Sequence, residues 1–544
     1  MEQKLTTLDI KVDDAWKQGL QSWNAPSVPY VITPRTSEEI KQLGEIGSAL
    51  KGQLAFMKYP EFQTYMNLEK IVTQFPTDPQ RATKAISTHE LGHRFCPYDI
   101  VTSIILNHAI TKALEGQKLP YDAKAAASNI LNLFSDMCIN TRLTRNGDED
   151  LTWMYQELSK DKGKEKSKLW HVYGRSMELA WNREILPKGT KMSDAEQKAA
   201  QEITGLFQHA YFDKAKWKEN SVNYAKIISK FLENEKQDGQ GSPDNTPGNN
   251  IPRDIDEKTA QELAKRVAQI GSDGLPQNPQ GLKEFQEIMV GYGKGDAKQA
   301  SIHFYDLLSK SYDVMFATQP FGRPRVNPFQ PIKWSPSMGT DRLDVDYSAQ
   351  VGGRIIPGVN TYAWNTRKRE AFGGMEEVVP NLDIYLDTSM SMPNPIEQIS
   401  LPVLAGFVAA KKAHKKGAKI RSTNFSDDEQ CTTQEFTRDL PSIFENLVIH
   451  YDGGTVFPTA TLLAGEDPRQ SLIITDTFLG NETETADAVK NIIQRNKSNR
   501  VTVYEINPNP RGAYLRSAGA EVIQGTTTDI FKRVIGKADQ VYRK

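Results

Sequence analysis

Hydrophobic residues in the first part of the chain recur mainly at the spacing of an α-helix. Ile100 and Ile104 follow this spacing in one segment, and Ile130 and Leu133 follow it in another. Residues three or four positions apart share one face of a helix, so such a pattern predicts helices that bury one side. We therefore predict that residues 1–236 form a mostly helical region.

The pattern disappears after residue 236. Residues 237–256 contain few apolar side chains and many Gly, Asn, Asp and Pro residues. Such a segment buries too little surface to offset the entropy lost on ordering, so we predict a flexible linker. Helical spacing returns from residue 257 to 317, and residues 318–379 are rich in Pro, Gly and aromatics. We expect residues 257–379 to be a connector that is helical first, then irregular and partly β.

From residue 380 to 544, short hydrophobic runs alternate with helix-like stretches. The predicted strands are 382–386, 418–422, 471–475, 501–506 and 521–523, and the first predicted helix spans 396–415. Strands that alternate with helices indicate a parallel sheet covered by helices. We therefore predict a Rossmann-like α/β domain over residues 380–544, in a multidomain protein.

Composition narrows the class of protein. The 544 residues are 38% hydrophobic and 25% charged, with a formal net charge of -1, so no overall basic charge favours nucleic acid or an acidic membrane. No stretch approaches the roughly 20 apolar residues that span a bilayer, and no apolar run follows the N-terminus. The three cysteines are widely spaced, which argues against disulfides. We expect a cytoplasmic protein.

The segment His89-Glu90-Leu91-Gly92-His93 has the spacing of a zinc-peptidase helix. Residues i and i+4 lie on one face of a helix, so His89 and His93 can bind one ion. Glu90 lies beside the first ligand and can take a proton from water that zinc has made more acidic. We predict zinc at this segment and Glu90 as the general base of amide hydrolysis. The alternatives are a helix with two surface histidines and a metal site that has decayed.

A catalytic zinc ion needs a third protein ligand, and Asp136 is the best candidate. It lies in a mostly apolar helical stretch, where a charge is costly unless it is paired or bound to metal. Asn132 and Asn140 lie one turn to either side and can support the ligands. His108 is the rival ligand, although a structural histidine is the more common outcome at such a position. For Cys96, near His93, we expect a buried inert thiol.

A second group of oxygen-bearing residues falls at the ends of predicted strands. Asp387 ends one strand, with Ser389 and Ser391 on the following loop, and Asp476 ends another strand. Thr455 follows two glycines that allow a tight loop. Carboxylates and hydroxyls bind hard cations such as Mg²⁺, and the carboxyl ends of parallel strands are where open α/β sheets bind ligands. We predict a magnesium site there.

This second group resembles the von Willebrand factor A domain and its metal-ion-dependent adhesion site. In that family the first loop is Asp-x-Ser-x-Ser, the second gives a threonine and the third an aspartate. The matching residues are, in order, Asp387, Ser389, Ser391, Thr455 and Asp476. Met390 and Thr477 stand where glycine is common. The resemblance covers residues 380–544 and implies a bound Mg²⁺ whose open position a partner's acidic side chain fills.

The two signatures together resemble bacterial and phage metallopeptidases with a C-terminal von Willebrand factor A-like domain. In that family an Asn-x3-Asp-x3-Asn segment follows the peptidase helix, as Asn132, Asp136 and Asn140 do here, and a Gly-Gly-Thr loop is typical. The resemblance implies a zincin-like N-terminal region and a partner ATPase of the MoxR type of AAA+ proteins. This chain has no Gly-Lys-Ser/Thr phosphate-binding loop, so ATP hydrolysis would belong to that other chain.

Two functions follow from these patterns. The first is a zinc-dependent peptidase, acting on a protein or peptide, whose C-terminal domain recruits a partner through Mg²⁺. The second is a non-catalytic adaptor, comparable to a chelatase subunit, which links an AAA+ ATPase to its target through the adhesion site. An extracellular adhesin fits poorly, because no signal peptide is predicted and the cysteine count is odd.

Overall fold

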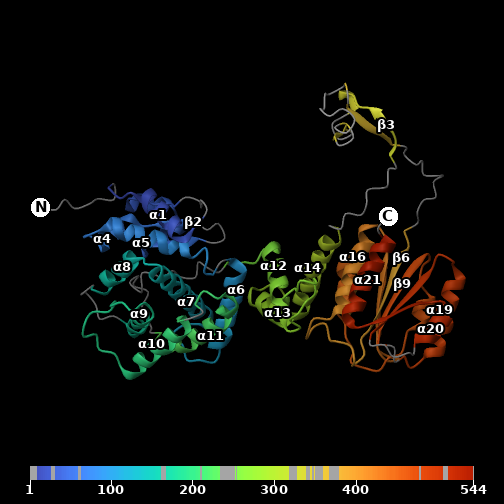
Figure 1. Cartoon of the computed structure of the whole chain (residues 1–544). Helices are drawn as coiled ribbons and strands as arrows, with labels where there is room; N and C mark the ends of the chain where they lie inside the picture. Colours follow the sequence, from blue (N-terminus) through green and yellow to red (C-terminus); the bar gives the residue numbers. More distant parts are fainter. Residues whose placement is uncertain are drawn as a thin grey trace. The chain divides into compact units, whose positions relative to one another are not determined.

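The computed structural model in Figure 1 describes most of the chain. The described residues are 9–25, 31–58, 63–97, 99–160, 167–208, 211–232, 252, 254–317, 328–338, 343–345, 348, 359, 361–366, 379–476, 479–506 and 512–542. Contacts divide the chain into two units. One comprises residues 1–263 and 288–294, and the other comprises residues 264–287 and 295–544. The predicted linker, 237–256, lies mainly outside the described residues, and the predicted domain limits remain predictions.

The N-terminal region is mostly helical, which confirms the prediction. Its helices are α1 (Val12–Trp23), α2 (Ser37–Gln42), α3 (Glu45–Lys51), α4 (Leu68–Gln74), α5 (Pro79–Gly92), α6 (Ile100–Leu114), α7 (Ala123–Arg145), α8 (Glu149–Ser159), α9 (Lys168–Trp181), α10 (Asp194–Phe207) and α11 (Trp217–Ile228). Single 3₁₀ turns occur at Lys214–Lys216 and Ser229–Phe231. Helix α1 and helices α4 to α11 share one continuous core, to which α5 and α7 both contribute, whereas α2 and α3 pack in a smaller cluster with Phe56 and Tyr65. Helix α5 packs against α1, as Figure 1 shows.

One feature of this region was not predicted. Strands β1 (Ala55–Lys58) and β2 (Gln63–Met66) pair antiparallel, and Ile32 forms a parallel bridge to Tyr65 in β2. Each strand has only four residues, which is too short for an alternating pattern to stand out in the sequence. Helix α5 contacts β1, so this small sheet lies beside the helix that carries the two predicted histidine ligands.

The middle of the chain is helical and then partly β, as predicted. Its helices are α12 (Glu257–Ala268), α13 (Gly281–Gly291) and α14 (Ala297–Ala317). Strands β3 (Pro328–Lys333), β4 (Leu343–Asp344) and β5 (Tyr362–Thr366) form a small antiparallel sheet with β5 in the centre. A 3₁₀ turn occurs at Pro336–Met338.

The C-terminal region is an α/β layered structure, which confirms the coarse prediction. Its strands are β6 (Asn381–Asp387), β7 (Ile420–Phe425), β8 (Cys431–Thr437), β9 (Arg469–Thr475), β10 (Arg500–Ile506) and β11 (Glu521–Gly525). Their order is β11-β10-β9-β6-β7-β8, and every neighbouring pair is parallel except β7 with β8. The helices are α16 (Leu401–Lys415), α17 (Leu440–Leu447), α18 (Thr459–Leu463), α19 (Glu482–Arg495), α20 (Ala513–Ser517) and α21 (Thr527–Tyr542).

Two details of this region differ from the predictions. The antiparallel edge strand β8 was not predicted, because its side chains are only half-buried and largely polar. Helix α16 was predicted from Ile396 but begins at Leu401, where the Ser400 hydroxyl accepts a hydrogen bond from the Val403 N–H and Pro402 occupies the first turn.

The order of the strands explains how the second predicted site is assembled. Strand β6 lies between β7 and β9, with Leu386 opposite Ile474. Asp387 and Asp476 therefore follow neighbouring parallel strands at the same edge of the sheet. None of the helices in the described part of the chain is long and apolar enough to cross a membrane.

Candidate metal centres

Helix α5 presents the two predicted histidine ligands on one face. It begins at Pro79, where the Asp78 side chain caps it, and it ends at Gly92. His93 follows directly and keeps helical dihedrals (φ -61°, ψ -16°), so it stays one turn beyond His89. The two imidazole rings lie 5.0 Å apart between centroids and are nearly perpendicular, at 86°.

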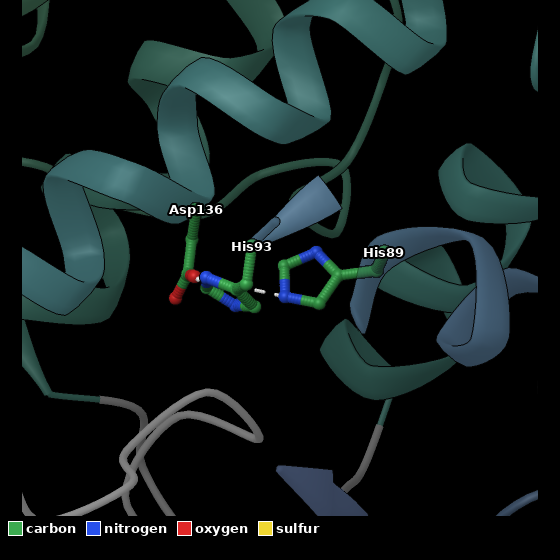
Figure 2. Close-up of side chains that lie close together, drawn as sticks. All are labelled: His89, His93 and Asp136. Carbon is green, nitrogen blue, oxygen red and sulfur yellow. Dashed lines mark ion pairs between the residues drawn. The ribbon is translucent and has the colours of Figure 1, made fainter. Parts of the chain in front are cut away.

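Asp136 on helix α7 completes the group. Its Oδ1 lies 3.6 Å from Nε2 of His89 and 3.2 Å from Nε2 of His93. Figure 2 shows these three side chains close together. Two ligands of a tetrahedral zinc ion, at metal distances near 2.0 Å, are separated by about 3.3 Å. Both measured separations are close to that value. In the described part of the chain, these three residues are the one group of His, Cys, Asp or Glu side chains that could hold a metal ion.

The three side chains are almost removed from solvent. Asp136 is 0% exposed, and His89 and His93 are 4% and 6% exposed. Burial of a carboxylate is strongly unfavourable unless a positive charge or hydrogen bonds compensate it. A divalent cation between the two imidazoles and the carboxylate would supply that compensation. The site therefore fits a metal ion on electrostatic grounds as well as by distance.

Asn140 fixes which nitrogen of His89 faces the carboxylate. Its Nδ2 donates to the hydroxyl of Tyr155 over 2.7 Å, so its Oδ1 points at Nδ1 of His89, also at 2.7 Å. An amide oxygen can only accept, so Nδ1 of His89 carries the hydrogen. In the neutral ring Nε2 then has its lone pair directed at the carboxylate side, as a metal ligand requires.

Asn132, one turn from Asp136 on the other side, orients the carboxylate. Its Nδ2 donates to Oδ2 of Asp136 over 3.0 Å, which leaves Oδ1 turned to the histidines. The supporting roles predicted for Asn132 and Asn140 thus correspond to hydrogen bonds in the structure.

Gly92 explains why α5 and α7 come so close. A Cβ atom at this position would lie 2.4 Å from Cγ2 of Ile139 on α7 and 2.7 Å from the indole of Trp23 on α1. Real Cβ atoms do not approach so closely, so any larger residue would push α5 away from α7. The glycine within the His-Glu-x-Gly-His segment therefore sets the distance between the histidines and Asp136.

The rival residues lie elsewhere. His108 is on α6, half-buried, and is not part of the group. Cys96 is buried and its thiol is hydrogen-bonded to Cys138, whose pKa is raised well above its usual value, mainly by burial and further by Cys96. Its high pKa makes the thiol of Cys138 a poor ligand and a poor nucleophile. Glu90 lies on α5 and is 7% exposed, and its predicted role as base remains a prediction.

The second predicted site is assembled from two loops that follow β6 and β9. Oδ1 of Asp387 accepts the backbone N–H of Ser389 over 2.9 Å. The hydroxyls of Ser389 and Ser391 are 3.1 Å apart, and the Ser391 hydroxyl donates to Oδ2 of Asp476. Asp387, Ser389 and Asp476 are buried, whereas Ser391 is exposed. Two carboxylates and two hydroxyls thus meet at the carboxyl edge of the sheet, and such a set of oxygens fits Mg²⁺.

The loop that carries Thr455 lies beside both of these loops. The N–H of Met390 donates to the carbonyl oxygen of Gly453 over 3.2 Å, and the N–H of Gly480 donates to the carbonyl oxygen of Thr455 over 2.7 Å. A Cβ at Gly453 would come within 2.6 Å of the Ser426 hydroxyl, so a larger residue would force the side chains around it to move. Thr455 itself is half-buried. Four of the predicted oxygen ligands are joined by hydrogen bonds, and Thr455 is on the adjoining loop.

Burial perturbs the central carboxylate of this site. It raises the pKa of Asp387 to about 6, although hydrogen bonds from Thr475 and Ser389 act in the opposite direction. The Thr475 hydroxyl donates to Oδ2 of Asp387 over 2.6 Å. A buried carboxylate whose ionised form is unfavourable gains stability from a bound cation.

Two supporting residues were not anticipated. Thr475 is the last residue of β9, and a polar residue there, next to Asp476, is a signal that sequence analysis could have used. Tyr155 on α8 left no such signal, because an amphipathic helix contains many tyrosines that only pack. Two residues depart from the adhesion-site pattern. Met390, in the first loop, is 78% exposed, and Thr477, which follows Asp476 in the third loop, is outside the described residues.

Comparisons with known proteins add little. No protein-family model and no curated protein matches the chain. Among the solved structures that match is the manganese-loaded TRAP protein of Plasmodium vivax, with 16% sequence identity and a TM-score of 0.22. The match covers 28% of this chain and 73% of that one. Such a TM-score does not establish a shared fold, so the class of this protein has to be inferred from its own residues.

Proposed function

We propose that this protein is a zinc-dependent metallopeptidase of zincin-like fold, joined to a von Willebrand factor A-like domain that binds Mg²⁺ and docks a partner. One observation carries the first half of the proposal. Two imidazole nitrogens from a single helix face the same oxygen of a fully buried carboxylate on another helix, at 3.6 and 3.2 Å. That is the separation expected of ligands that share one ion.

The donor set favours zinc over other biological metals. Two neutral imidazoles and one carboxylate are borderline ligands, which suit Zn²⁺, whereas Mg²⁺ and Ca²⁺ prefer sites made only of oxygen. Catalytic zinc sites have three protein ligands and an open position, and His89, His93 and Asp136 supply three. When bound there, zinc would act as a Lewis acid toward water and toward a peptide carbonyl.

In this proposal, each residue of the site has a separate role. His89, His93 and Asp136 hold the ion, and Asn140 and Asn132 keep the ligands in orientation. Glu90, next to His89 on α5, takes a proton from the attacking water and returns it to the leaving amine. The substrate class that this chemistry serves is a protein or peptide.

The decisive experiment compares Glu90→Gln with the wild type in the full-length protein. With zinc present, cleavage of an unstructured protein such as casein should fall roughly 100- to 10,000-fold in the variant, because a general base is lost. Its zinc content should stay unchanged, since Glu90 is not a ligand. Equal cleavage by the two proteins would exclude Glu90 as the base.

A pair of histidine variants locates the metal. His93→Ala should lose both zinc and cleavage, because it removes one ligand. His108→Ala is the matched control, since His108 is a half-buried histidine on α6 outside the group and its removal should change neither. If the two variants retained equal amounts of zinc, the assignment of His93 would be wrong.

The docking half of the proposal is supported by the oxygens at the edge of the C-terminal sheet. Mg²⁺ held by Asp387, Ser389, Ser391, Thr455 and Asp476 would accept an Asp or Glu side chain from a partner, which we propose is a MoxR-type AAA+ ATPase. The Asp387→Ala variant should fail to capture such an ATPase in the presence of Mg²⁺. Undiminished capture by the variant would exclude this site as the docking point.

An adaptor without catalysis is the second candidate. It is supported by the hydrogen-bonded oxygens of the candidate magnesium site, because a partner could bind there without any peptidase activity in the chain. The two candidates differ in one result. An adaptor would bind the ATPase through Asp387 while wild type and Glu90→Gln show the same absence of cleavage, with and without that ATPase.

A further inference from the structure

The loop between the candidate magnesium site and helix α16 is held in place by α13 and α14. Ser391 ends the metal-site motif, and Ser400 caps α16, so this loop comprises residues 392–399. Helix α14 packs along α16, as Figure 1 shows, and residues 264–287 and 295–544 belong to one contact unit. The contacts described next all lie within that unit.

Tyr305 on α14 binds the backbone of this loop with its hydroxyl. The hydroxyl accepts the N–H of Ser400 over 2.9 Å, and the carbonyl oxygens of Pro395 and Gln398 lie 3.1 and 3.2 Å away. A hydroxyl has one hydrogen, so it donates to one of these carbonyls at a time. The Tyr305 side chain is 0% exposed. One phenol thus ties both ends of the segment 395–400 to α14.

Two further residues hold the middle of the loop. Nε2 of Gln286 on α13 donates to the carbonyl oxygen of Ile396 over 2.7 Å, and its contact with the hydroxyl of Ser301 is equally short. The carbonyl oxygen of Pro279 accepts the N–H of Ile399 over 3.2 Å. Backbone groups of the loop are therefore satisfied by residues that precede the sheet by about a hundred positions in the sequence.

Helix α14 is also fixed to the body of α16. Nζ of Lys411 is 2.6 Å from Oδ1 of Asp306 and donates to the carbonyl oxygen of Asp306 over 2.7 Å. The ring of Tyr305 packs against that of Phe407, with 5.4 Å between centroids. The helix that carries Tyr305 is thus anchored independently of the loop, which makes it a rigid support for it.

We propose that Tyr305 is a positioning residue for the candidate magnesium site and that metal affinity is coupled to the packing of α14. The proposal rests on Mg²⁺ binding at that site. The loop directly follows Ser391, whose hydroxyl donates to Asp476, and the N–H of Met392, the first residue of the loop, donates to the carbonyl oxygen of Ser389 over 2.9 Å. A shift of the loop therefore displaces both serine hydroxyls, and Mg²⁺ tolerates little departure from its preferred geometry.

Coupling of this kind acts in both directions. If a fixed loop favours Mg²⁺, then bound Mg²⁺ stabilises the contact of the loop with α14 by the same free energy. A partner that binds at the metal would thereby stabilise the packing of α13 and α14, which precede the sheet in the chain.

The test uses Tyr305→Phe in the full-length protein, with Tyr312→Phe as a matched control. Both changes remove one buried hydroxyl from α14 and keep the ring. The Tyr312 ring packs edge-on against Phe531, at 5.0 Å, and within the described part of the chain its hydroxyl has no hydrogen-bond partner. Titration calorimetry with Mg²⁺ should show an Asp387-dependent affinity that falls roughly three- to tenfold in Tyr305→Phe and stays unchanged in Tyr312→Phe.

A second readout separates positioning from simple loss of stability. Both variants lower the melting temperature without metal if their hydroxyls matter to folding, but the increase on adding Mg²⁺ should shrink only in Tyr305→Phe. Gln286→Leu, which removes the donor to Ile396, should shrink it in the same way. Equal Mg²⁺ affinity in Tyr305→Phe and Tyr312→Phe would overturn the role of Tyr305 and leave the magnesium site intact. Identical Mg²⁺ binding by wild type and Asp387→Ala would overturn both.

Discussion

The candidate zinc site is built from two long helices, whereas the candidate magnesium site is built from loops at the ends of strands. His89 and Asp136 are carried by α5 and α7 and lie within the continuous core of the N-terminal helices. Asp387 is instead the last residue of β6, Asp476 directly follows β9, and Ser391 beside them is exposed. The first site is therefore rigid and almost closed, and the second is open on one side.

The two candidate sites also differ in their ligand atoms. The helical site offers nitrogen and oxygen, and the loop site offers oxygen alone. A rigid, nitrogen-containing site suits an ion that stays bound, and an open oxygen site suits an ion that shares its shell with a partner. If both proposed sites bind their metals, the comparison teaches that ligand type and accessibility would direct Zn²⁺ to the first site and Mg²⁺ to the second.

The largest expected effect comes from two variants, each of which removes one negative charge from one of the two sites. Asp136→Asn keeps the shape of the side chain, but zinc affinity should fall at least about 100-fold, since the ligand charge is lost. Mg²⁺ binding should be unchanged. Asp387→Ala should give the reverse result. Metal analysis after dialysis and calorimetry would check both, and loss of both metals in either variant would show that the sites are not independent.

The next effect concerns the residues that orient the zinc ligands. Asn140→Ala should lower zinc affinity roughly 10- to 100-fold, because His89 loses the group that fixes its tautomer. Asn129→Ala is the matched control on the same helix, since the Asn129 amide only approaches the hydroxyl of Tyr121, at 3.4 Å. Competition with a chromophoric zinc chelator measures both affinities. Equal values would mean that Asn140 does not support the site.

These two predictions also show how far the sequence alone leads. A spacing of four residues places side chains on one face of a helix, so local periodicity grouped His89 with His93, and Asp136 with its flanking asparagines. Asp136 was joined to the histidines because a charge in an apolar stretch is costly unless it is paired or bound to metal. That α5 and α7 then meet face to face depends on packing at Gly92, which periodicity does not describe. The helical and α/β regions could likewise be predicted from the hydrophobic pattern.

What could not be predicted depends on contacts between distant residues. Strand β8 pairs with β7 as an antiparallel edge, and its polar, half-buried residues lack the hydrophobic run that marks the inner strands. The anchoring of loop 392–399 by Tyr305 joins positions that are about ninety residues apart. No short-range pattern contains such information, because the tyrosine looks like any other core residue of an amphipathic helix.

A moderate effect is expected where the two zinc-site helices touch. Gly92→Ala should destabilise the N-terminal region by about 1–3 kcal/mol and weaken zinc binding, because the new methyl group would overlap Ile139 and separate α5 from α7. Gly205→Ala is the control, since Gly205 in α10 has no atom within 4 Å of an added Cβ. Chemical denaturation measures the free energy of unfolding. Equal stability of the two variants would refute close packing at Gly92.

The smallest expected effect lies at the open site. Met390→Gly restores the glycine that is common in adhesion sites, and Mg²⁺ affinity should change by no more than about twofold, since the Met390 side chain is 78% exposed. Calorimetry against the wild type measures the difference. A tenfold change would mean that Met390 shapes the loop, and the contrast between a rigid zinc site and a tolerant magnesium site would weaken.

The most direct test of the central claim is a crystal structure of the zinc-loaded protein, with anomalous diffraction collected on both sides of the zinc absorption edge. The account predicts a strong zinc peak between Nε2 of His89, Nε2 of His93 and Oδ1 of Asp136, and no such peak in crystals of His93→Ala. An empty map at these three atoms, with zinc bound elsewhere or not at all, would contradict it.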